Sequence, residues 1–537
     1  MGSIDVNRLS YHLPGGRRLF EDVSFKVGDG QHTALVGANG VGKTTLLGVV
    51  AGRNKPSEGT VAVDGRLGVM DQLVGMRGEQ RTVRDLFASL SPPAVAAAAL
   101  ELEAATHAAE RAAQGGKPSF VEKAGLRLAQ AHADWGSVGG YEIEVAWNVC
   151  ATEAVGLDLD TASARPLATF SGGQQKRLAL EFLLRGTDDV LLLDEPDNFL
   201  DVPGKQWLER RLDASRKTIL FISHDRELLA RAAHRIVTIE GDGAWTHGGS
   251  FVGYAEARDA RLRKLEDDHQ QWMDERKRLV EYLRIMKERA KVSDANASRA
   301  RAAETRLRHF DEAGPPPERP NDQKITMRLD GGRTGKRAII VEELELTDLT
   351  FPWSTEIWFG ERVGVLGGNG TGKSHLLRLL AGDATVRHEG RCELGARVVP
   401  GHFSQTHDHP ELVGRTLLDV LHDLDLARGP AMSRLRRYEL QSAAEQTFET
   451  LSGGQQARFQ ILLLELGGAT LLLLDEPTDN LDVASAEALE SAIASFEGTV
   501  VAVTHDRWFM KNLDRFLVFN EDGEVTETDS FHSATPG

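Results

Sequence analysis

Two glycine-rich loops in this chain have the composition of phosphate-binding loops. They span residues 37–44 and 367–374. The N–H groups of such a loop can wrap phosphate oxygens at the N-terminus of the following helix, where the helix dipole favours an anion. Lys43 and Lys373 would reach the β- and γ-phosphates of a nucleotide, and the hydroxyls of Thr44 and Ser374 would ligate Mg²⁺. The alternative for each loop is a glycine-rich turn that holds no ligand.

Each loop is followed by two further motifs in the same order. The first is a Ser-Gly-Gly-Gln run that begins a helix, and its glycines let the backbone approach a phosphate closely. The second is an apolar strand that ends in Asp194 and Glu195, or in Asp475 and Glu476. The aspartate would hold Mg²⁺ through water, and the glutamate would be the general base for the attacking water. Solvated surface acids are the alternative. The two runs consist of Ser171, Gly172, Gly173, Gln174, Ser452, Gly453, Gly454 and Gln455.

The two sets of motifs are in register. In both halves the serine of the run lies 23 positions before the strand-end aspartate, and that aspartate lies 30 positions before a histidine, His224 or His505. The loop lysine lies 128 positions before the serine in the first half and 79 positions before it in the second, so the first half carries 49 additional residues. Matched spacing of this kind indicates a tandem repeat.

In these motifs and their order the chain resembles the tandem ATP-binding cassette ATPases. The resemblance implies an α/β fold with two P-loop nucleotide-binding domains. In that family the Ser-Gly-Gly-Gln run faces the phosphate loop of the other cassette, which implies two composite sites, Lys43 with Ser452 and Lys373 with Ser171. ATP would hold the two halves together, and hydrolysis would let them open.

The same resemblance assigns further ligands. His224 and His505 resemble the switch histidine that contacts the γ-phosphate, and Gln72 and Gln405 resemble the Q-loop glutamine that touches Mg²⁺ and water. Tyr11 lies ahead of the first loop, where these ATPases place an aromatic ring against adenine, although an ordinary strand-edge tyrosine is the alternative.

The candidate site residues can now be stated in full. The aromatic partner of adenine in the second half stays open between Phe351 and Trp353. The catalytic candidates are Glu195, Glu476, His224 and His505. The ATP-binding candidates are Tyr11, Gly37, Asn39, Gly40, Gly42, Lys43, Thr44, Thr45, Gln72, Ser171, Gly172, Gly173, Gln174, Gly367, Asn369, Gly370, Gly372, Lys373, Ser374, Gln405, Ser452, Gly453, Gly454 and Gln455. The Mg²⁺ candidates are Thr44, Gln72, Asp194, Ser374, Gln405 and Asp475.

The segments after the two catalytic glutamates, known as D-loops in this family, differ between the halves. Residues 477–482 have a common form, whereas residues 196–201 depart from it at Asp197 and Phe199. Nothing in the sequence explains these two departures.

Composition limits the class of protein. A chain of 537 residues fits two or three domains, and a net charge of −17 argues against a protein that coats nucleic acid, unless basic residues cluster locally. Cys150 and Cys392 are too few for a disulfide framework or a cysteine metal cluster, which fits a reducing cytosol. The sequence shows no secretory signal and no run of about 18 apolar residues. We therefore expect a cytoplasmic protein with no membrane part.

The additional residues of the first half read as an inserted helical arm at about 92–136. Residues 94–113 are rich in Ala, Leu and Glu, residues 114–119 break the helix, and residues 120–135 resume it. The insertion is either a tolerated surface element or a docking arm.

Between the cassettes the sequence predicts a charged helical linker. From residue 255 to about 310 it is helix-prone, with a turn at 291–297 and a second helix from 299 to 310. Apolar residues recur in a narrow, coiled-coil-like stripe. They are Leu262, Leu265, Trp272, Leu279, Leu283 and Met286. The expected domains are thus a first ATPase domain (1–254), the linker (255–321) and a second ATPase domain (322–537).

The tip of this linker is basic. Between residues 284 and 308 eight cations face three acids, Glu288, Asp294 and Glu304, which gives a local charge of +5. The cations are Arg284, Lys287, Arg289, Lys291, Arg299, Arg301, Arg306 and Arg308. Such a tip suits docking to a phosphate backbone, and a solvated helix face is the alternative.

Two cassettes, an arm in the first, a charged helical linker and the entry sequence at 248–254 together resemble the ABC-F family. That resemblance implies an ATPase with ATP and Mg²⁺ as cofactors, and the ribosome as partner. The linker tip would contact rRNA and tRNA, the arm would point to the ribosome's periphery, and the chain would act as a monomer through pairing of its own cassettes. No transmembrane partner and no DNA are expected.

The resemblance leaves several functions open. The protein could regulate elongation or rescue stalled ribosomes, which the short linker turn favours. It could instead protect the ribosome from macrolide, lincosamide or pleuromutilin antibiotics. An ATPase subunit of a membrane importer is a further alternative. The ribosome-recycling cassette protein is excluded, because two cysteines cannot supply its iron–sulfur domain.

Overall fold

Each half of the chain folds around a six-stranded sheet in a computed structural model, which describes residues 2–71, 81–115, 117–241, 243–291, 294–320, 325–404 and 409–529. The strand order is β5-β6-β7-β3-β8-β9 in the first half and β14-β15-β16-β12-β17-β18 in the second. The first sheet comprises β3 (His32–Gly37), β5 (Leu67–Met70), β6 (Val190–Asp194), β7 (Thr218–Ile222), β8 (Arg235–Glu240) and β9 (Gly243–His247). The second comprises β12 (Arg362–Gly367), β14 (Pro400–Phe403), β15 (Leu471–Asp475), β16 (Thr499–Val503), β17 (Arg515–Phe519) and β18 (Val525–Thr528). The predicted tandem α/β architecture is confirmed.

The central strands of both sheets are parallel and buried. Every residue of β6, β7, β15 and β16 is buried, and their sequences are nearly continuous apolar runs. Strands covered on both faces have this composition, because neither face meets water. Strands β6 and β15 are paired on both sides, so Asp194 and Asp475 leave the sheet at equivalent edges.

A three-stranded antiparallel sheet accompanies each central sheet. Its order is β2-β1-β4 in the first half and β11-β10-β13 in the second. These strands are β1 (Ser3–His12), β2 (Arg18–Val27), β4 (Glu58–Asp64), β10 (Arg337–Leu346), β11 (Trp353–Trp358) and β13 (His388–Leu394). Inward residues of β1 and β2, such as Leu9 and Phe20, pack in one cluster with the first central sheet.

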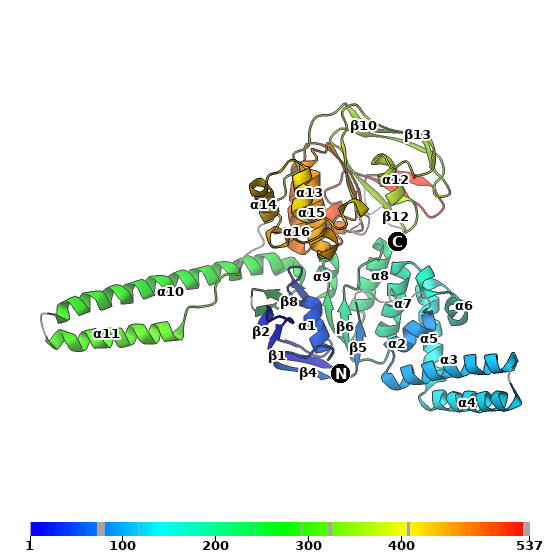
Figure 1. Ribbon diagram of the computed structural model, residues 1–537, viewed down its shortest axis with the longest axis horizontal. Helices are drawn as coiled ribbons and strands as arrows, with labels where there is room; N and C mark the ends of the chain where they lie inside the picture. The colour runs from blue at the N-terminus through cyan, green and yellow to red at the C-terminus, as the bar shows by residue number, and fades with distance from the viewer. Residues whose placement is uncertain are drawn as a thin grey trace. The chain divides into compact units, whose positions relative to one another are not determined.

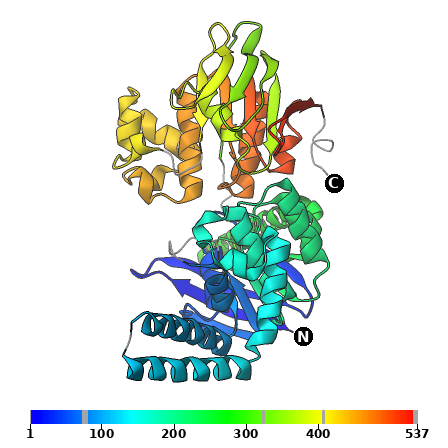
Figure 2. The same ribbon diagram turned by 90° about the vertical axis from the view of Figure 1, so that its right-hand side faces the viewer.

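Helices pack beside the sheets of each half (Figure 1). In the second half the helices coloured yellow to light orange gather on one side of the strands (Figure 2). The helices of the first half are α1 (Lys43–Val50), α2 (Val83–Leu90), α5 (Gly140–Val155), α6 (Leu159–Ser163), α7 (Gly172–Arg185), α8 (Val202–Asp213) and α9 (Arg226–Ala232). Those of the second are α12 (Lys373–Leu380), α13 (Leu417–Asp423), α14 (Arg428–Arg437), α15 (Gly453–Leu466), α16 (Val483–Ser495) and α17 (Arg507–Met510).

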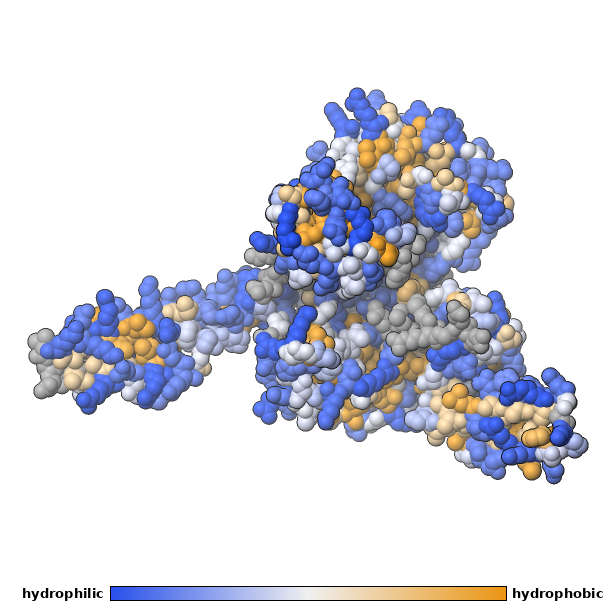
Figure 3. All heavy atoms as spheres, in the orientation of Figure 1, coloured by the Kyte–Doolittle hydropathy of each residue, from blue (hydrophilic) through white to orange (hydrophobic). Residues whose placement is uncertain are grey.

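Two further helices, α3 (Pro93–Ala113) and α4 (Pro118–Ser137), lie side by side in the stretch for which the sequence predicts an inserted arm (Figure 1). At the base of this arm Trp135 packs against Trp147 of α5, with ring centroids 5.8 Å apart. A Cβ on Gly140 would lie 2.1 Å from the Trp135 ring, so only glycine allows this packing. Apolar side chains appear on the surface of α3 and α4 (Figure 3), among them Leu100 and Leu126.

The linker between the halves forms a compact unit of its own, His247–Asp322, whereas Met1–Thr246 and Gln323–Gly537 group together. It consists of α10 (Tyr254–Ala290) and α11 (Asp294–Ala313), which pack along each other. Trp272 stacks on Phe310 with ring centroids 5.4 Å apart. Arg276 donates two hydrogen bonds, of 2.8 and 3.3 Å, to the carboxylate of Asp311.

The second linker helix begins inside the stretch 291–297 for which the sequence predicts a turn. Helix α11 begins at Asp294, five residues before the predicted start, so only residues 291–293 connect the two helices. The prediction took the Ser, Asp and Asn residues of this stretch as turn formers. Ala295 and Ala297, which are strong helix formers, alternate with them and let the helix start earlier.

The packing at the base of the arm predicts a measurable stability difference. Trp135 is 1% exposed, so Trp135→Ala should destabilise the first cassette by about 3–5 kcal/mol through lost burial and a residual cavity. Leu126→Ala is the matched control on the same helix, because Leu126 is 68% exposed, and it should change stability by less than about 0.5 kcal/mol. Chemical denaturation of both variants tests this, and equal stabilities would contradict the packing described.

Candidate active site

Each phosphate loop joins a central strand to the helix that follows it. β3 leads through residues 37–42 into α1, and β12 leads through residues 367–372 into α12. The last loop glycines, Gly42 and Gly372, have φ of 104° and 102°, a conformation that disfavours residues with a Cβ. The two loops thus have the same backbone form, with their N–H groups next to a helix N-terminus.

The loop lysines lie over their own loops. Lys43 Nζ donates to the carbonyl oxygens of Gly37 (2.8 Å) and Ala38 (3.2 Å), and Lys373 makes the equivalent pair of bonds in the second half. Burial lowers the pKa of both lysines, and nearby carboxylates counteract this, for Lys43 those of Asp482 and then Glu195. The ammonium groups are therefore placed where phosphate oxygens would meet the loop.

The expected Mg²⁺ ligands meet in pairs. The Thr44 hydroxyl lies beside the carboxylate of Asp194 and counteracts the rise in its pKa that burial causes, and the Ser374 hydroxyl does the same for Asp475. One carboxylate oxygen of Asp194, Oδ1, is buried and has no hydrogen-bond partner among the described residues. A hydroxyl beside a buried carboxylate with a spare oxygen fits a hard cation such as Mg²⁺. The Q-loop candidates Gln72 and Gln405 lie outside the described residues.

The two catalytic candidates that follow these aspartates are carboxylates in a strained backbone, and Glu476 is buried whereas Glu195 is half-buried. Glu195 and Glu476 have φ of 49° and 48°, in the left-handed region that costs energy for residues with a Cβ. Burial, followed by the charges of Asp194 and Asp197, raises the pKa of Glu195 to about 7. Burial likewise raises the pKa of Glu476. A carboxyl with a pKa near neutrality is suited to accept a proton from water.

His505 lies beside Glu476, whereas Glu195 contacts an asparagine. Glu476 Oε2 accepts from the backbone N–H of His505 (3.0 Å), and its Oε1 lies 3.4 Å from His505 Nε2. Glu195 Oε2 instead accepts from Asn198 Nδ2 (2.6 Å). Burial, followed by the charge of Lys373, lowers the pKa of His505 to about 3, and burial lowers that of His224 as well. Both histidines are therefore neutral at physiological pH.

The structure brings each phosphate loop to the other half's D-loop. The backbone N–H of Asn39 donates to Asp482 Oδ2 (3.1 Å), and Asn39 Nδ2 donates to the carbonyl oxygen of Asn480 (3.0 Å). In the opposite direction Asn369 Nδ2 donates to the carbonyl oxygen of Phe199 (3.4 Å). The candidate residues for one nucleotide site are thus contributed by both halves.

The Ser-Gly-Gly-Gln runs lie beside these same contacts. Ser171 and Ser452 cap α7 and α15, each accepting from the backbone N–H three residues later. A Cβ on Gly454 would lie 2.3 Å from Asn39 Nδ2, so this run approaches the first phosphate loop closely. A cavity of about 280 Å³ lies between the other run and the second half, lined by residues of both. Its lining includes Ser171, Gly172, Asn369, Glu476 and His505.

The aromatic candidates for adenine stacking differ in exposure. Tyr11 is half-buried on β1, with its ring centroid 6.0 Å from that of Phe20. Trp353 is 8% exposed and packs edge-on against Phe519, so it belongs to the core of the second half. Phe351 is 61% exposed. Of the two alternatives in the second half, Phe351 is the one that a base could reach.

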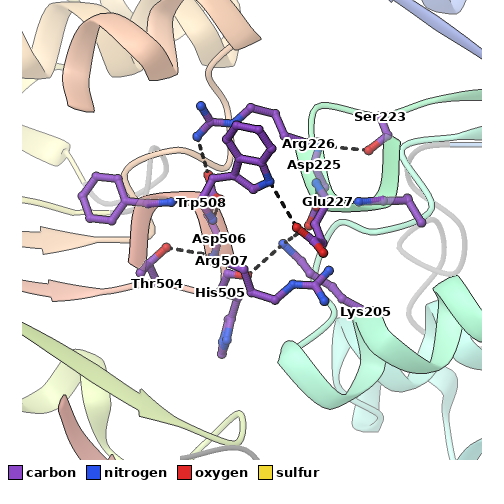
Figure 4. Close-up of polar contacts among 12 residues, drawn as sticks. Lys205, Ser223, Asp225, Arg226, Glu227, Thr504, His505, Asp506, Arg507 and Trp508 are labelled. Atoms are coloured by element: carbon purple, nitrogen blue, oxygen red, sulfur yellow. Dashed lines mark hydrogen bonds and ion pairs between the residues drawn. The ribbon is translucent and has the colours of Figure 1, made fainter. Parts of the chain in front are cut away.

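Sequence reasoning missed two ion pairs that join the halves. Arg226 binds Glu490 with one hydrogen bond of 3.1 Å and a second, shorter one, and Arg507 binds Glu209 in the same manner. Arg226 also lies over the ring of Trp508, which donates from its Nε1 to Glu227 (Figure 4). The missed signal is that an arginine follows His-Asp in both halves, and a glutamate lies eight residues after both D-loop aspartates.

The linker tip is less basic than its sequence window suggests. Arg284, Lys287, Arg306 and Arg308 form ion pairs with acids of the linker. Three of these acids lie outside the 284–308 window, and they are Glu275, Glu281 and Glu312. Lys291, Arg299 and Arg301 are exposed and form no ion pair among the described residues, so the unpaired charge lies beside the connection between α10 and α11.

Comparison with known proteins supports the nucleotide chemistry of both halves. The ABC transporter family model matches residues 20–198 and 351–479. The chain is 52% identical to the "Antibiotic resistance protein" of Mycobacteroides abscessus, over 98% of this chain and 99% of that relative. It is 31% identical to the tylosin resistance ATP-binding protein TlrC of Streptomyces fradiae, over 91% and 92%. It is 29% identical to the energy-dependent translational throttle protein EttA of Haemophilus influenzae, over 97% and 92%.

Solved structures share the fold. A chain in a model of ribosome-bound archaeal Pelota and ABCE1 is 18% identical with a TM-score of 0.58, over 97% of this chain and 78% of that one. The RNase-L inhibitor is 16% identical with a TM-score of 0.56, over 97% and 90%. Within the described residues, no helix is both long and apolar enough to cross a membrane.

The two candidate glutamates give a direct test of the catalytic assignment. Glu195→Gln with Glu476→Gln keeps the side-chain shape but removes the proton acceptor, so turnover should fall by about 10²–10⁴-fold while ATP still binds. Phosphate release and equilibrium nucleotide binding measure the two effects. The exposed Glu318→Gln is the control and should hydrolyse ATP like the unmodified protein. Wild-type turnover in the double variant would remove both glutamates from the base role.

Proposed function

Because the chain belongs to the ABC-F family of tandem ATP-binding cassette ATPases, we propose that it acts on translation by binding the ribosome in its ATP-closed state. Hydrolysis at the two composite sites releases it. The cassettes that pair are halves of one chain, so a single copy suffices. A ribosomal partner places this activity in the cytoplasm.

The observation that carries this proposal is the charge at the end of the α10–α11 hairpin. Lys291, Arg299 and Arg301 are exposed and unpaired within the described residues, on a protein whose net charge is −17. Cations of this kind gain free energy from a phosphate backbone by releasing its counterions. The paired cations, such as Arg284 and Lys287, hold the hairpin together and contribute less.

Binding of ATP between the cassettes would determine when the protein binds the ribosome. ATP bound at the Lys43 loop would touch the Ser452 run, and ATP at the Lys373 loop would touch the Ser171 run, so binding joins the halves. The contacts from Asn39 and Asn369 to the opposite D-loops support this arrangement. Mg²⁺ held near Thr44 and its counterpart Ser374 would neutralise charge on the transferring phosphate. Glu195 and Glu476 would orient and deprotonate the attacking water.

A second candidate is protection of the ribosome from an antibiotic. It is favoured by the names of two relatives that match over most of their length, the Mycobacteroides abscessus protein named for antibiotic resistance and TlrC, named for tylosin resistance. The throttle protein EttA favours regulation of translation instead. The short connection between α10 and α11, residues 291–293, favours regulation of translation over antibiotic protection.

Ribosome binding should depend on ATP and on the catalytic glutamates. The Glu195→Gln, Glu476→Gln protein should sediment with purified ribosomes in the presence of ATP and remain in the supernatant without it. Lys43→Ala with Lys373→Ala is the control, since it cannot hold ATP and should not sediment under either condition. Absence of association with ATP would overturn the ribosome proposal and direct the search to a membrane permease.

The hairpin tip should set the salt dependence of that binding. Replacing Lys291, Arg299 and Arg301 by Gln should lower the slope of log K against log salt by about 0.7–0.9 per cation, or about 2–3 in all. The control replaces Arg263, Lys264 and Lys277 of α10 by Gln, which removes the same charge farther from the tip. Equal slopes for both triple variants would show that the tip is a solvated helix face with no special role in ribosome binding.

Drug susceptibility separates the two candidates. Expression in a susceptible bacterium should raise the inhibitory concentration of a macrolide, lincosamide or pleuromutilin if the protein protects the ribosome. The Lys43→Ala, Lys373→Ala variant should give no protection. Unchanged susceptibility to all three classes, together with ATP-dependent ribosome binding, would leave regulation of translation as the function.

A further inference from the structure

Three aligned positions near the catalytic glutamates carry charge in the first cassette and none in the second. The two halves align without gaps from the Ser-Gly-Gly-Gln run to the histidine, so each position has a defined counterpart. Lys176, Asp197 and Lys205 of the first cassette correspond to Ala457, Thr478 and Ala486 of the second. The three charged side chains are 2–8% exposed. A buried charge is costly unless it is paired, so this difference between the halves calls for a structural explanation.

Lys205 lies on α8 of the first cassette but reaches the second. Its Nζ lies 3.1 Å from Asp225 Oδ2 in its own cassette. The same ammonium donates a long hydrogen bond of 3.5 Å to the backbone carbonyl oxygen of His505 in the other cassette (Figure 4). Lys205 therefore links the two histidine loops across the interface.

Carboxylates surround this ammonium from both sides. Burial alone lowers the pKa of Lys205, but the charges of Asp225, Asp479 and Asp197 raise it above its usual range. Asp225 is fixed as the cap of α9, where it accepts from the N–H groups of Glu227 and Leu228. Lys205 thus remains charged, and its position follows from fixed acids on the first cassette and from Asp479 on the second.

The carbonyl oxygen that Lys205 binds is that of His505, which belongs to the candidate hydrolysis site of the Lys373 loop. Lys205 lines the 280 Å³ cavity together with Glu476, His505 and the Ser171 run. His505 in turn contacts Glu476 through its backbone N–H and its ring. An ammonium that fixes the carbonyl oxygen of His505 therefore fixes the partner of the catalytic glutamate. In the Lys43 site the position corresponding to Lys205 is Ala486, which has no ammonium to offer.

We propose that Lys205 is a positioning residue, supplied by the first cassette, for hydrolysis at the site of the Lys373 loop in the second. It holds the His505 loop against Glu476 when the two cassettes are closed. At the Lys43 site the equivalent position is Ala486, so the two composite sites of one chain are chemically unequal. This inference concerns ATP hydrolysis and holds whatever partner the closed protein binds.

The test separates the two sites by their glutamates. In Glu195→Gln protein the Lys373 site alone keeps its base, and in Glu476→Gln protein the Lys43 site alone keeps it. Adding Lys205→Met should slow single-turnover ATP hydrolysis about tenfold in the first background, a loss typical of removing a residue that orients a reacting group. It should change the rate less than about twofold in the second. Both rates are measured by chemical quench under single-turnover conditions, in which each protein hydrolyses only the ATP that it has already bound.

The ATP dependence and two controls distinguish positioning from a general weakening of the interface. Among the described residues the polar partners of Lys205 are Asp225 and the carbonyl oxygen of His505, neither of which belongs to a phosphate loop, so the rate at saturating ATP should fall while the ATP concentration at half-maximal rate stays unchanged. Lys205→Arg should restore part of the rate, because a guanidinium can reach the same carbonyl oxygen. Lys217→Met removes another lysine that holds two carbonyl oxygens of the first cassette, those of Leu183 and Gly186, and should leave both rates unchanged.

A paired variant guards against misfolding. Asp197→Thr with Lys205→Ala gives the first cassette the residues of the second and removes one cation together with one anion, so fewer buried charges stay uncompensated. It should melt close to the unmodified protein and still show the slow rate in the Glu195→Gln background. Equal slowing in both backgrounds, or an unchanged rate in the Glu195→Gln background for a folded variant, would overturn the proposal.

Discussion

The contact of each phosphate loop with the opposite D-loop is the constraint on which both hydrolysis sites depend. Asn39 and Asn369 bind D-loop backbone of the other cassette, and the Ser-Gly-Gly-Gln runs lie beside these contacts. The candidate groups of each site therefore come from both halves. Burial of Glu195 and Glu476 at this junction gives their carboxyl groups a proton affinity suited to catalysis near neutral pH.

The junction between the cassettes contains contacts that occur in both directions and one that occurs in only one direction. The Arg226–Glu490 and Arg507–Glu209 pairs repeat a single contact in both directions, as a near-twofold arrangement requires. Lys205 and its acids break that symmetry on one side only. Removing one partner from a buried ion cluster is expensive, whereas replacing the whole cluster with neutral residues is cheaper. The second cassette has neutral residues only at the positions of Lys176, Asp197 and Lys205, and it keeps an aspartate, Asp506, at the position of Asp225.

Sequence reasoning succeeded where the determining interactions are local. Glycines at fixed spacing, an apolar strand and a capping serine specify the loops, β6 and α7 from neighbouring residues alone. It overestimated the charge of the tip because Glu281 and Glu312, one turn from Arg284 and Arg308, lay outside the window that was counted. It could not foresee the role of Lys205, whose partner His505 is 300 positions away.

The length of α10 has a mechanical consequence. Its 37 residues form one uninterrupted helix from Tyr254 to Ala290, and at 1.5 Å per residue it is a rod of about 55 Å. A tilt of about 10° at its first turn would sweep its far end through about 10 Å, the diameter of a helix with its side chains. A small change of angle at one end of such a rod is therefore a displacement on the scale of a whole secondary-structure element at the other end.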